Sequence, residues 1–133
     1  MIAIPKAIHD DMIAHAREGF PLEVCGILGG VGDTVSVNYR MTNSDASNEH
    51  FMMDPREQFT VVKDLRVKGL VMLAIYHSHP ETPARPSEED IKLALTPDVS
   101  YLIISLADAA APVIKSFKID SGKVQIEPIE IKV

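Results

Sequence analysis

Fourteen residues in the second half of the chain, 77–90, contain the side chains best suited to chemistry. His77 and His79 are separated by one residue at the end of an apolar run, and Asp90 follows after a loop that contains three prolines. Residues i and i+2 of a strand point to the same face about 6.5 Å apart, so both imidazoles can reach one ion. With Asp90 as a third ligand, this pattern predicts zinc with one position free for water, as in catalytic sites.

Each half of this motif also has a simpler interpretation. Two histidines in a His-x-His pair are often just partly exposed side chains. Ser87-Glu88-Glu89-Asp90 fits a helix cap, in which Ser87 accepts a hydrogen bond from the backbone of the first turn. A cap alone, however, does not explain two histidines at the end of the preceding strand, which favours the metal site for the combined pattern.

Hydrolysis of an amide also needs a group that takes a proton from water and gives it to the departing amine. Glu23, at the entrance to an apolar segment with the sequence Val24-Cys25-Gly26, is a candidate for that group. The chain has nineteen acidic residues, and most such residues are solvated, so the position of Glu23 alone does not select it.

Composition limits the class of protein. The chain has 133 residues, of which 46% are hydrophobic and 24% charged, which predicts a single compact domain over residues 1–133. The net charge of −6 argues against nucleic acid as a partner. The single cysteine, Cys25, excludes an intrachain disulfide and a cysteine-cluster metal site. The apolar runs are too short to span a bilayer and no signal peptide is evident, so we expect a cytoplasmic protein without a membrane partner.

Hydrophobic periodicity and turn residues predict an α/β fold with a mixed, largely antiparallel sheet flanked by helices. Helices are expected from Pro5 to a stop at Gly19, from Asp54-Pro55 to Gly69, and over 88–95. The run 70–76 is expected to be a central strand covered on both faces. The other predicted strands are 24–31 and 34–41, which form a hairpin, a short strand at 50–53, a buried strand at 99–106, and a terminal hairpin of 113–119 with 124–131.

Taken together, these motifs resemble the signature of the JAMM (MPN+) metallopeptidases. The resemblance rests on His77-Ser78-His79-Pro80, on Ser87-x-x-Asp90 seven residues later, and on Glu23 in Pro21-x-Glu23-x-Cys25-Gly26, with further agreement at Asn43 and 51–55. It implies the cytidine-deaminase-like JAMM/MPN fold and one zinc ion per chain with a catalytic water. It further implies that His77, His79 and Asp90 bind this zinc, that Glu23 is the general acid/base, and that Ser87 steadies the water or donates to the oxyanion.

The chain is similar to the stand-alone prokaryotic members, because it has no long insertion of the kind that grips ubiquitin. This similarity implies a peptidase or isopeptidase acting on the Gly-Gly tail of a ubiquitin-like or sulfur-carrier protein, with the tail expected along an exposed sheet edge. Apolar edge strands are compatible with a homodimer. Two alternatives stay open: a RadC-like, DNA-associated protein, which salt-sensitive DNA binding would favour, and a non-catalytic MPN interaction module, which a failure to bind zinc would favour.

Overall fold

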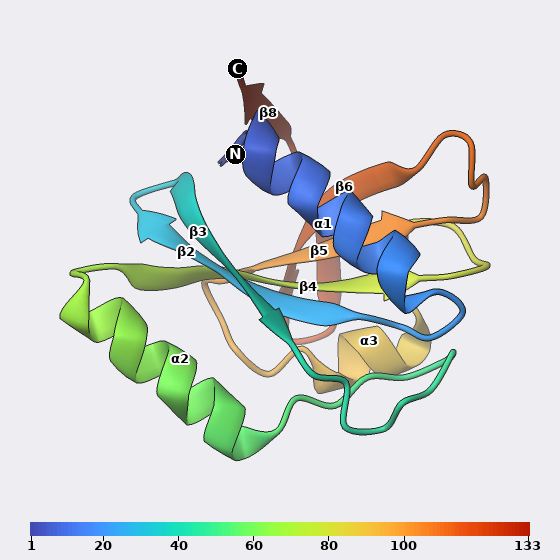
Figure 1. Cartoon of the computed structure of the whole chain (residues 1–133), viewed down its shortest axis with the longest axis horizontal. Coiled ribbons are helices and arrows are strands. Elements are labelled where there is room, and N and C mark those ends of the chain that lie inside the picture. Colours follow the sequence, from blue (N-terminus) through green and yellow to red (C-terminus); the bar gives the residue numbers. More distant parts are fainter.

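The computed structural model describes all residues 1–133, and its centre is one eight-stranded sheet (Figure 1). The strands are β1 (Ile2–Pro5), β2 (Cys25–Val31), β3 (Thr34–Met41), β4 (Val71–His79), β5 (Ser100–Ser105), β6 (Val113–Asp120), β7 (Lys123–Glu127) and β8 (Ile129–Lys132). They follow the spatial order β7-β6-β5-β4-β2-β3-β1-β8. Four of the seven neighbouring pairs are antiparallel and three are parallel, which confirms a mixed sheet with an antiparallel majority.

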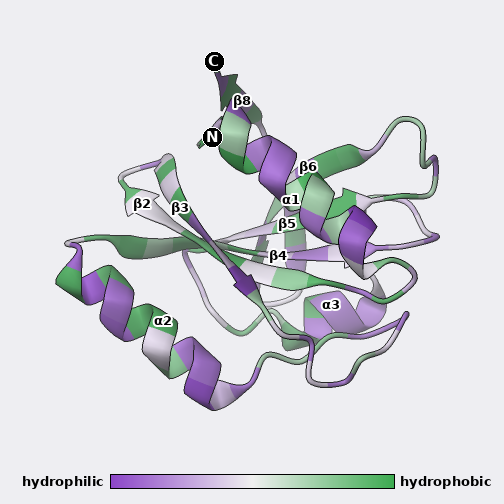
Figure 2. Ribbon diagram, in the orientation of Figure 1, coloured by the Kyte–Doolittle hydropathy of each residue, from purple (hydrophilic) through white to green (hydrophobic).

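Helices cover both faces of this sheet. Helix α1 (Lys6–Gly19) packs on one face, and α2 (Pro55–Val67) and α3 (Glu88–Leu93) pack on the other (Figure 1). Helices α1 and α2 alternate hydrophilic and hydrophobic residues, as expected for elements with one buried face, whereas the short α3 is mostly hydrophilic and has no buried residue (Figure 2). Because successive strand residues point to opposite faces, β4 contributes Tyr76 to the α1 side and Ile75 to the α2 side.

The ends of α2 follow the local signals in the sequence. The Asp54 carboxylate accepts a hydrogen bond from the Arg56 N–H at 2.8 Å, Pro55 occupies the first turn, and Gly69 adopts a φ of 69° just beyond the helix. Helix α1 ends at Gly19 as predicted, but the left-handed conformation expected there is wrong, because Gly19 is still helical and Phe20 caps the helix with a φ of −52°. The start of α1 is one residue later than predicted, since Pro5 has extended backbone and ends β1.

The strands differ from the expectations in three places, and the differences at β1 and β8 have a non-local cause. Strand β1 was not predicted, because it is four residues long and its partners β3 and β8 lie far away in the sequence. The segment 50–53 forms only an isolated bridge between Met53 and Asn43. The last predicted strand is divided at Pro128: β7 pairs with β6, whereas β8 crosses to the opposite edge beside β1.

The central position of β4 determines what surrounds its carboxyl end. Strands β2 and β5 flank it, while the two sheet edges are β7 and β8. These edges are separated from β4 by two strands on one side and three on the other, so neither is adjacent to its end. The expected binding of a substrate tail along an exposed sheet edge near the metal therefore stays a prediction, with neither β7 nor β8 adjacent to the end of β4. None of the helices has the length and apolar character needed to cross a membrane.

Candidate metal centre

The two histidines extend from the buried end of β4. His77 and His79 lie on the same face of the strand, and their Nε2 atoms are 3.1 Å apart. Ser78 points to the opposite face, where its Oγ accepts a hydrogen bond from the Val24 N–H at 2.8 Å. The single residue between the histidines thus ties β4 to the segment that contains Glu23.

The proline-containing loop returns the chain to the histidines. Ser105 Oγ donates to the Thr82 carbonyl at 2.6 Å and holds the loop against β5. The Pro83 carbonyl lies 2.9 Å from His79 Nδ1, which favours the tautomer with the proton on Nδ1 and leaves Nε2 free to bind an ion. This orienting contact has no signature in the sequence, since any residue can supply a carbonyl.

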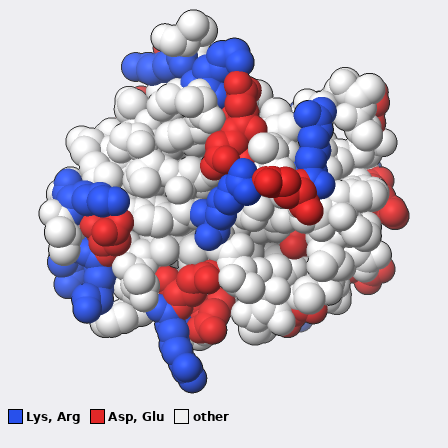
Figure 3. Space-filling model, in the orientation of Figure 1, with Lys and Arg blue, Asp and Glu red and all other residues white.

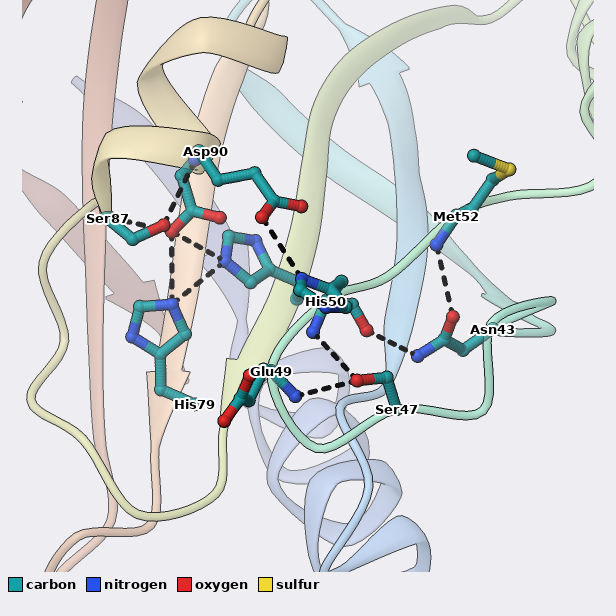
Figure 4. A network of polar contacts seen from close by, with 10 residues as sticks. Asn43, Ser47, Glu49, His50, Met52, His79, Ser87 and Asp90 are labelled. Carbon is teal, nitrogen blue, oxygen red and sulfur yellow. Dashed lines mark hydrogen bonds and ion pairs between the residues drawn. The ribbon is translucent and has the colours of Figure 1, made fainter.

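Helix α3 begins with a capping box that also positions an acid. Ser87 Oγ accepts a hydrogen bond from the Asp90 N–H at 3.0 Å, and the Ser87 N–H donates to Asp90 Oδ2 at 2.9 Å. The same Oδ2 lies 3.2 Å from His77 Nε2 and 3.1 Å from His79 Nε2 (Figure 4). Helix cap and metal ligand were competing interpretations of the sequence, and the structure shows that Asp90 can serve as both.

We call His77, His79 and Asp90 the metal centre, because their ligand atoms converge on one point. Nitrogen ligands about 2.0–2.1 Å from a zinc ion at tetrahedral angles are about 3.3 Å apart. The donor atoms here are 3.1–3.2 Å apart, so a small rotation of the side chains fits such an ion. Two imidazoles and one carboxylate leave a fourth tetrahedral position free.

The protonation states of His77 and Asp90 also suit ligands, whereas for His79 burial is outweighed by hydrogen bonds to Asp90 and Pro83, which raise its pKa. Burial lowers the pKa of His77, which favours the neutral imidazole that metals bind. Burial opposes ionisation of Asp90, but its hydrogen bonds to the two histidines outweigh this and hold its pKa well below the usual range. The carboxylate therefore stays charged at neutral pH and can balance part of the charge of a cation.

Glu23 is held beside the metal centre by its backbone. Its N–H donates to the Ser47 carbonyl at 2.8 Å, and its own carbonyl accepts from Asn43 Nδ2 at 3.0 Å. The residue is only 5% exposed, and its Oε1 is buried without a hydrogen-bond partner. Burial raises the pKa of Glu23 to about 7, and the charges of His79 and Asp90 also act on it. An unpartnered carboxyl group with a pKa near neutrality can both accept and release a proton.

Two further residues border the metal centre: His50, to which sequence reasoning gave no role, and Phe51, which it noted only within the motif agreement at 51–55. The Phe51 ring stacks on His77 with centroids 4.7 Å apart. His50 Nδ1 lies 3.0 Å from Glu89 Oε2, a contact that joins the 43–53 segment to α3; Figure 4 shows His50 with its polar contacts. Periodicity could not identify them, because they lie outside regular elements. Together with α3 and the sheet they enclose a pocket lined by His50, Phe51, His77, Pro86, Glu89, Asp90, Leu93, Tyr101, Ile103 and Ile119. Its mostly apolar inner wall suits a hydrophobic group beside the metal centre.

Comparison with known proteins identifies the family. Residues 5–120 match the family model described as prokaryotic homologs of the JAB domain. The chain is 37% identical over 133 residues to a Mycobacterium tuberculosis protein named CysO-cysteine peptidase, covering 98% of this chain and 91% of that protein.

Two further proteins are similar over most of their length. A Haloferax volcanii protein named desampylase is 36% identical over 111 residues, covering 78% of this chain and 80% of the relative. A Desulfitobacterium hafniense protein of known solution structure matches with a TM-score of 0.91 and 54% identity, covering 99% of this chain and 93% of that one. The fold, the metal centre and these similarities agree, and the chain belongs to the prokaryotic JAB family, the stand-alone JAMM (MPN+) hydrolases.

Proposed function

We propose that this protein is a zinc-dependent peptidase that hydrolyses an amide bond at the C-terminal tail of a ubiquitin-like or sulfur-carrier protein ending in Gly-Gly. The observation that carries the proposal is the convergence of His77 Nε2, His79 Nε2 and Asp90 Oδ2 within 3.1–3.2 Å of one another, beside the buried, unpartnered carboxyl group of Glu23. A ligand set with a free position and an adjacent proton carrier is what hydrolysis requires.

In this proposal His77, His79 and Asp90 hold one zinc ion per chain. When bound there, zinc polarises the scissile carbonyl and lowers the pKa of a water molecule that serves as nucleophile. The chain contributes the rigidity of the site: β4 fixes the histidines, the Pro83 carbonyl orients His79, and the α3 cap orients Asp90. Orienting contacts of this kind increase metal affinity, because fewer side-chain conformations are lost on binding.

Glu23 is the proposed general acid/base. Its carboxylate takes a proton from the attacking water and then, as the carboxylic acid, donates it to the nitrogen of the departing amine. The pKa of about 7 supports both steps, because each protonation state is accessible near neutral pH.

Ser87 has a hydroxyl proton that its cap hydrogen bond does not use, since Oγ acts there as the acceptor from the Asp90 N–H. We propose that this O–H donates to the oxygen of the tetrahedral intermediate. One such donor contributes about 3 kcal/mol to stabilisation of a transition state.

The names of two relatives support the substrate class. One relative is called a CysO-cysteine peptidase, a name that states both a peptidase activity and a cysteine-bearing substrate. The other is called a desampylase. Because the edge strands are distant from β4, we propose that the tail lies between the 43–53 segment and α3, where the apolar pocket opens beside the metal centre. We further propose that residues 1–133 act as one catalytic domain in the cytoplasm, with no requirement for a nucleic-acid or membrane partner.

Metal analysis and intact-mass spectrometry test this function. The wild-type protein should contain about one zinc per chain and should trim a Gly-Gly-tailed carrier protein extended by one cysteine. Glu23→Gln should keep the zinc but lose trimming, whereas His79→Ala should lose both. Glu130→Gln, an exposed residue of β8, is the matched control and should behave like wild type. Near-normal turnover of the Glu23 variant would remove the assigned role, and no trimming of any carrier by a zinc-loaded enzyme would refute the substrate class.

A further inference from the structure

Strand β7 is an open edge of the sheet with exposed apolar side chains. Only β6 pairs with it, in a register without a shift. Val124 is 38% exposed and Ile126 is 75% exposed, although their cross-strand neighbours Ile119 and Phe117 are buried. The strand contains no proline and no bulge, which are features that protect many edge strands from pairing with another chain.

The free backbone groups of β7 belong to its two apolar residues. The hairpin of β6 and β7 has the two-residue turn Ser121-Gly122, in which both residues adopt a positive φ. The pair that closes such a turn is hydrogen-bonded, and hydrogen-bonded pairs alternate along the ladder. Lys123 closes this turn opposite Asp120, so it and every second residue after it direct their backbone groups towards β6. The N–H and C=O groups of Val124 and Ile126 therefore point outwards, where no strand meets them.

The sequence of β7 is complementary to itself in the antiparallel direction. If the outward groups of Val124 pair with those of Ile126 of the partner subunit, and the reverse, about four hydrogen bonds form around a twofold axis at Gln125. The apolar side chains then contact each other across the axis, and Lys123 lies opposite Glu127 of the partner subunit. Parallel pairing in register would instead place Lys123 against Lys123 of the partner subunit, and like charges opposite each other are destabilising.

Other parts of the surface offer less to a second copy. Figure 3 shows acidic and basic side chains next to one another on the face that carries α1 and α2, without a large patch of one sign. The opposite sheet edge, β8, has four residues against five in β7, and its Ile131 is only 38% exposed. The tail of a carrier protein also suits β7 poorly, because two strands separate β7 from β4.

We propose that two copies of this chain associate by antiparallel pairing of their β7 strands, which joins the two sheets into one. Both metal centres stay open, since β5 and β6 lie between β7 and β4. Val124 lies opposite Ile119, a residue of the pocket beside the metal centre, so Ile126 of the partner subunit extends this apolar row. Pairing of one short strand covers less than the about 1,200 Å² of standard interfaces, so we expect a Kd of about 10–100 μM.

Analytical ultracentrifugation of the full chain tests the association. The wild type should change from monomer to dimer as its concentration rises from about tenfold below to about tenfold above that Kd. Ile126→Lys should weaken the dimer about tenfold or more, because it places a charge on the paired edge. Lys123→Glu should also weaken it, since two acidic residues then face each other. Ile131→Lys on β8 is the matched control and should dimerise like the wild type. Urea unfolding of each variant checks that the fold is intact.

A cysteine at the twofold axis tests the register. Residues opposite each other in a pair without hydrogen bonds have Cα atoms about 4.5 Å apart, a separation that a disulfide spans. Gln125→Cys should therefore form a covalent dimer on oxidation, seen by electrophoresis without reductant. Glu130→Cys on β8 should stay monomeric, and the natural Cys25 is buried and should not react.

Several results would overturn the proposal. One is a wild type that stays monomeric across the concentration range, and another is a dimer that survives Ile126→Lys but dissociates with Ile131→Lys. Cross-linking of Glu130→Cys as fast as Gln125→Cys would show that encounter is not specific to β7. If the wild type is monomeric and a Gly-Gly-tailed peptide binds it but not the Ile126→Lys variant, the edge takes the substrate tail and not a second copy.

Discussion

Replacement of Glu23 by glutamine should remove hydrolysis and, at the same time, stabilise the metal-free protein at alkaline pH. The carboxyl group is 5% exposed and its Oε1 has no hydrogen-bond partner, so the folded state holds an uncompensated charge whenever Glu23 ionises. Glutamine has nearly the same shape and no charge. The buried carboxylate of Glu23 is therefore expected to lower the free energy of unfolding, and the gain in stability of Glu23→Gln should measure that effect.

The magnitude follows from the pKa of Glu23. Burial raises this pKa from 4.5 to about 7, which corresponds to about 3 kcal/mol of free energy of unfolding. A carboxyl group with a raised pKa binds its proton more tightly in the folded state. The loss of folding stability caused by ionising Glu23 is therefore absent below pH 4.5, grows between pH 4.5 and 7, and is complete above pH 7. The stability difference between Glu23→Gln and wild type should thus rise with pH to about 3 kcal/mol, or about 10 °C in melting temperature for a chain of this length.

The assay is chemical unfolding of both proteins at pH 5 and pH 8 in the presence of a chelator, which keeps metal from altering the electrostatics. The exposed control Glu130→Gln should show no pH-dependent difference from wild type. An equal stability gain at both pH values would mean that glutamine acts through packing and not through charge. No gain at pH 8 would show that Glu23 is not desolvated in the folded protein, and the acid/base assignment would lose its physical basis.

Three further predictions concern residues around this site. Ser87→Ala should lose about 1 kcal/mol of stability in thermal melting, because the Asp90 N–H loses its acceptor, whereas Ser87→Asn should keep this stability because asparagine also caps helices. Both variants should lower kcat about 100-fold, because both lack the hydroxyl proposed to stabilise the oxyanion. Gly26→Ala should lose about 1–3 kcal/mol of stability in urea unfolding and bind zinc more weakly, because a Cβ there would lie 2.1–2.2 Å from ring carbons of Tyr76, the residue before the ligand His77. Burial raises the pKa of Cys25 to about 12, so iodoacetamide at pH 8 should leave the mass and activity of the native protein unchanged; rapid labelling with inactivation would contradict this.

Local patterns were reliable where neighbouring residues decide the structure. The Asp54-Pro55 start and the Gly69 stop of α2 are satisfied by contacts within a few residues, and both were predicted. The turn residues of the two hairpins likewise define them locally. Strand β1 and the crossing of β8 could not be found in this way, because their pairing depends on segments more than a hundred residues apart. Short strands with distant partners leave almost no periodic signal.

The sequence by itself determined the donor types of the candidate site and part of their geometry. A two-residue spacing in a strand places His77 and His79 on one face, and a three-residue spacing at a helix start places Asp90 over its cap. Only the tertiary structure decided that Asp90 Oδ2 meets both imidazoles, and that Glu23 lies buried beside them without a partner. The pKa of Glu23 depends on this burial and on charges distant in sequence. Such a property belongs to the folded environment, and no pattern of neighbouring residues encodes it.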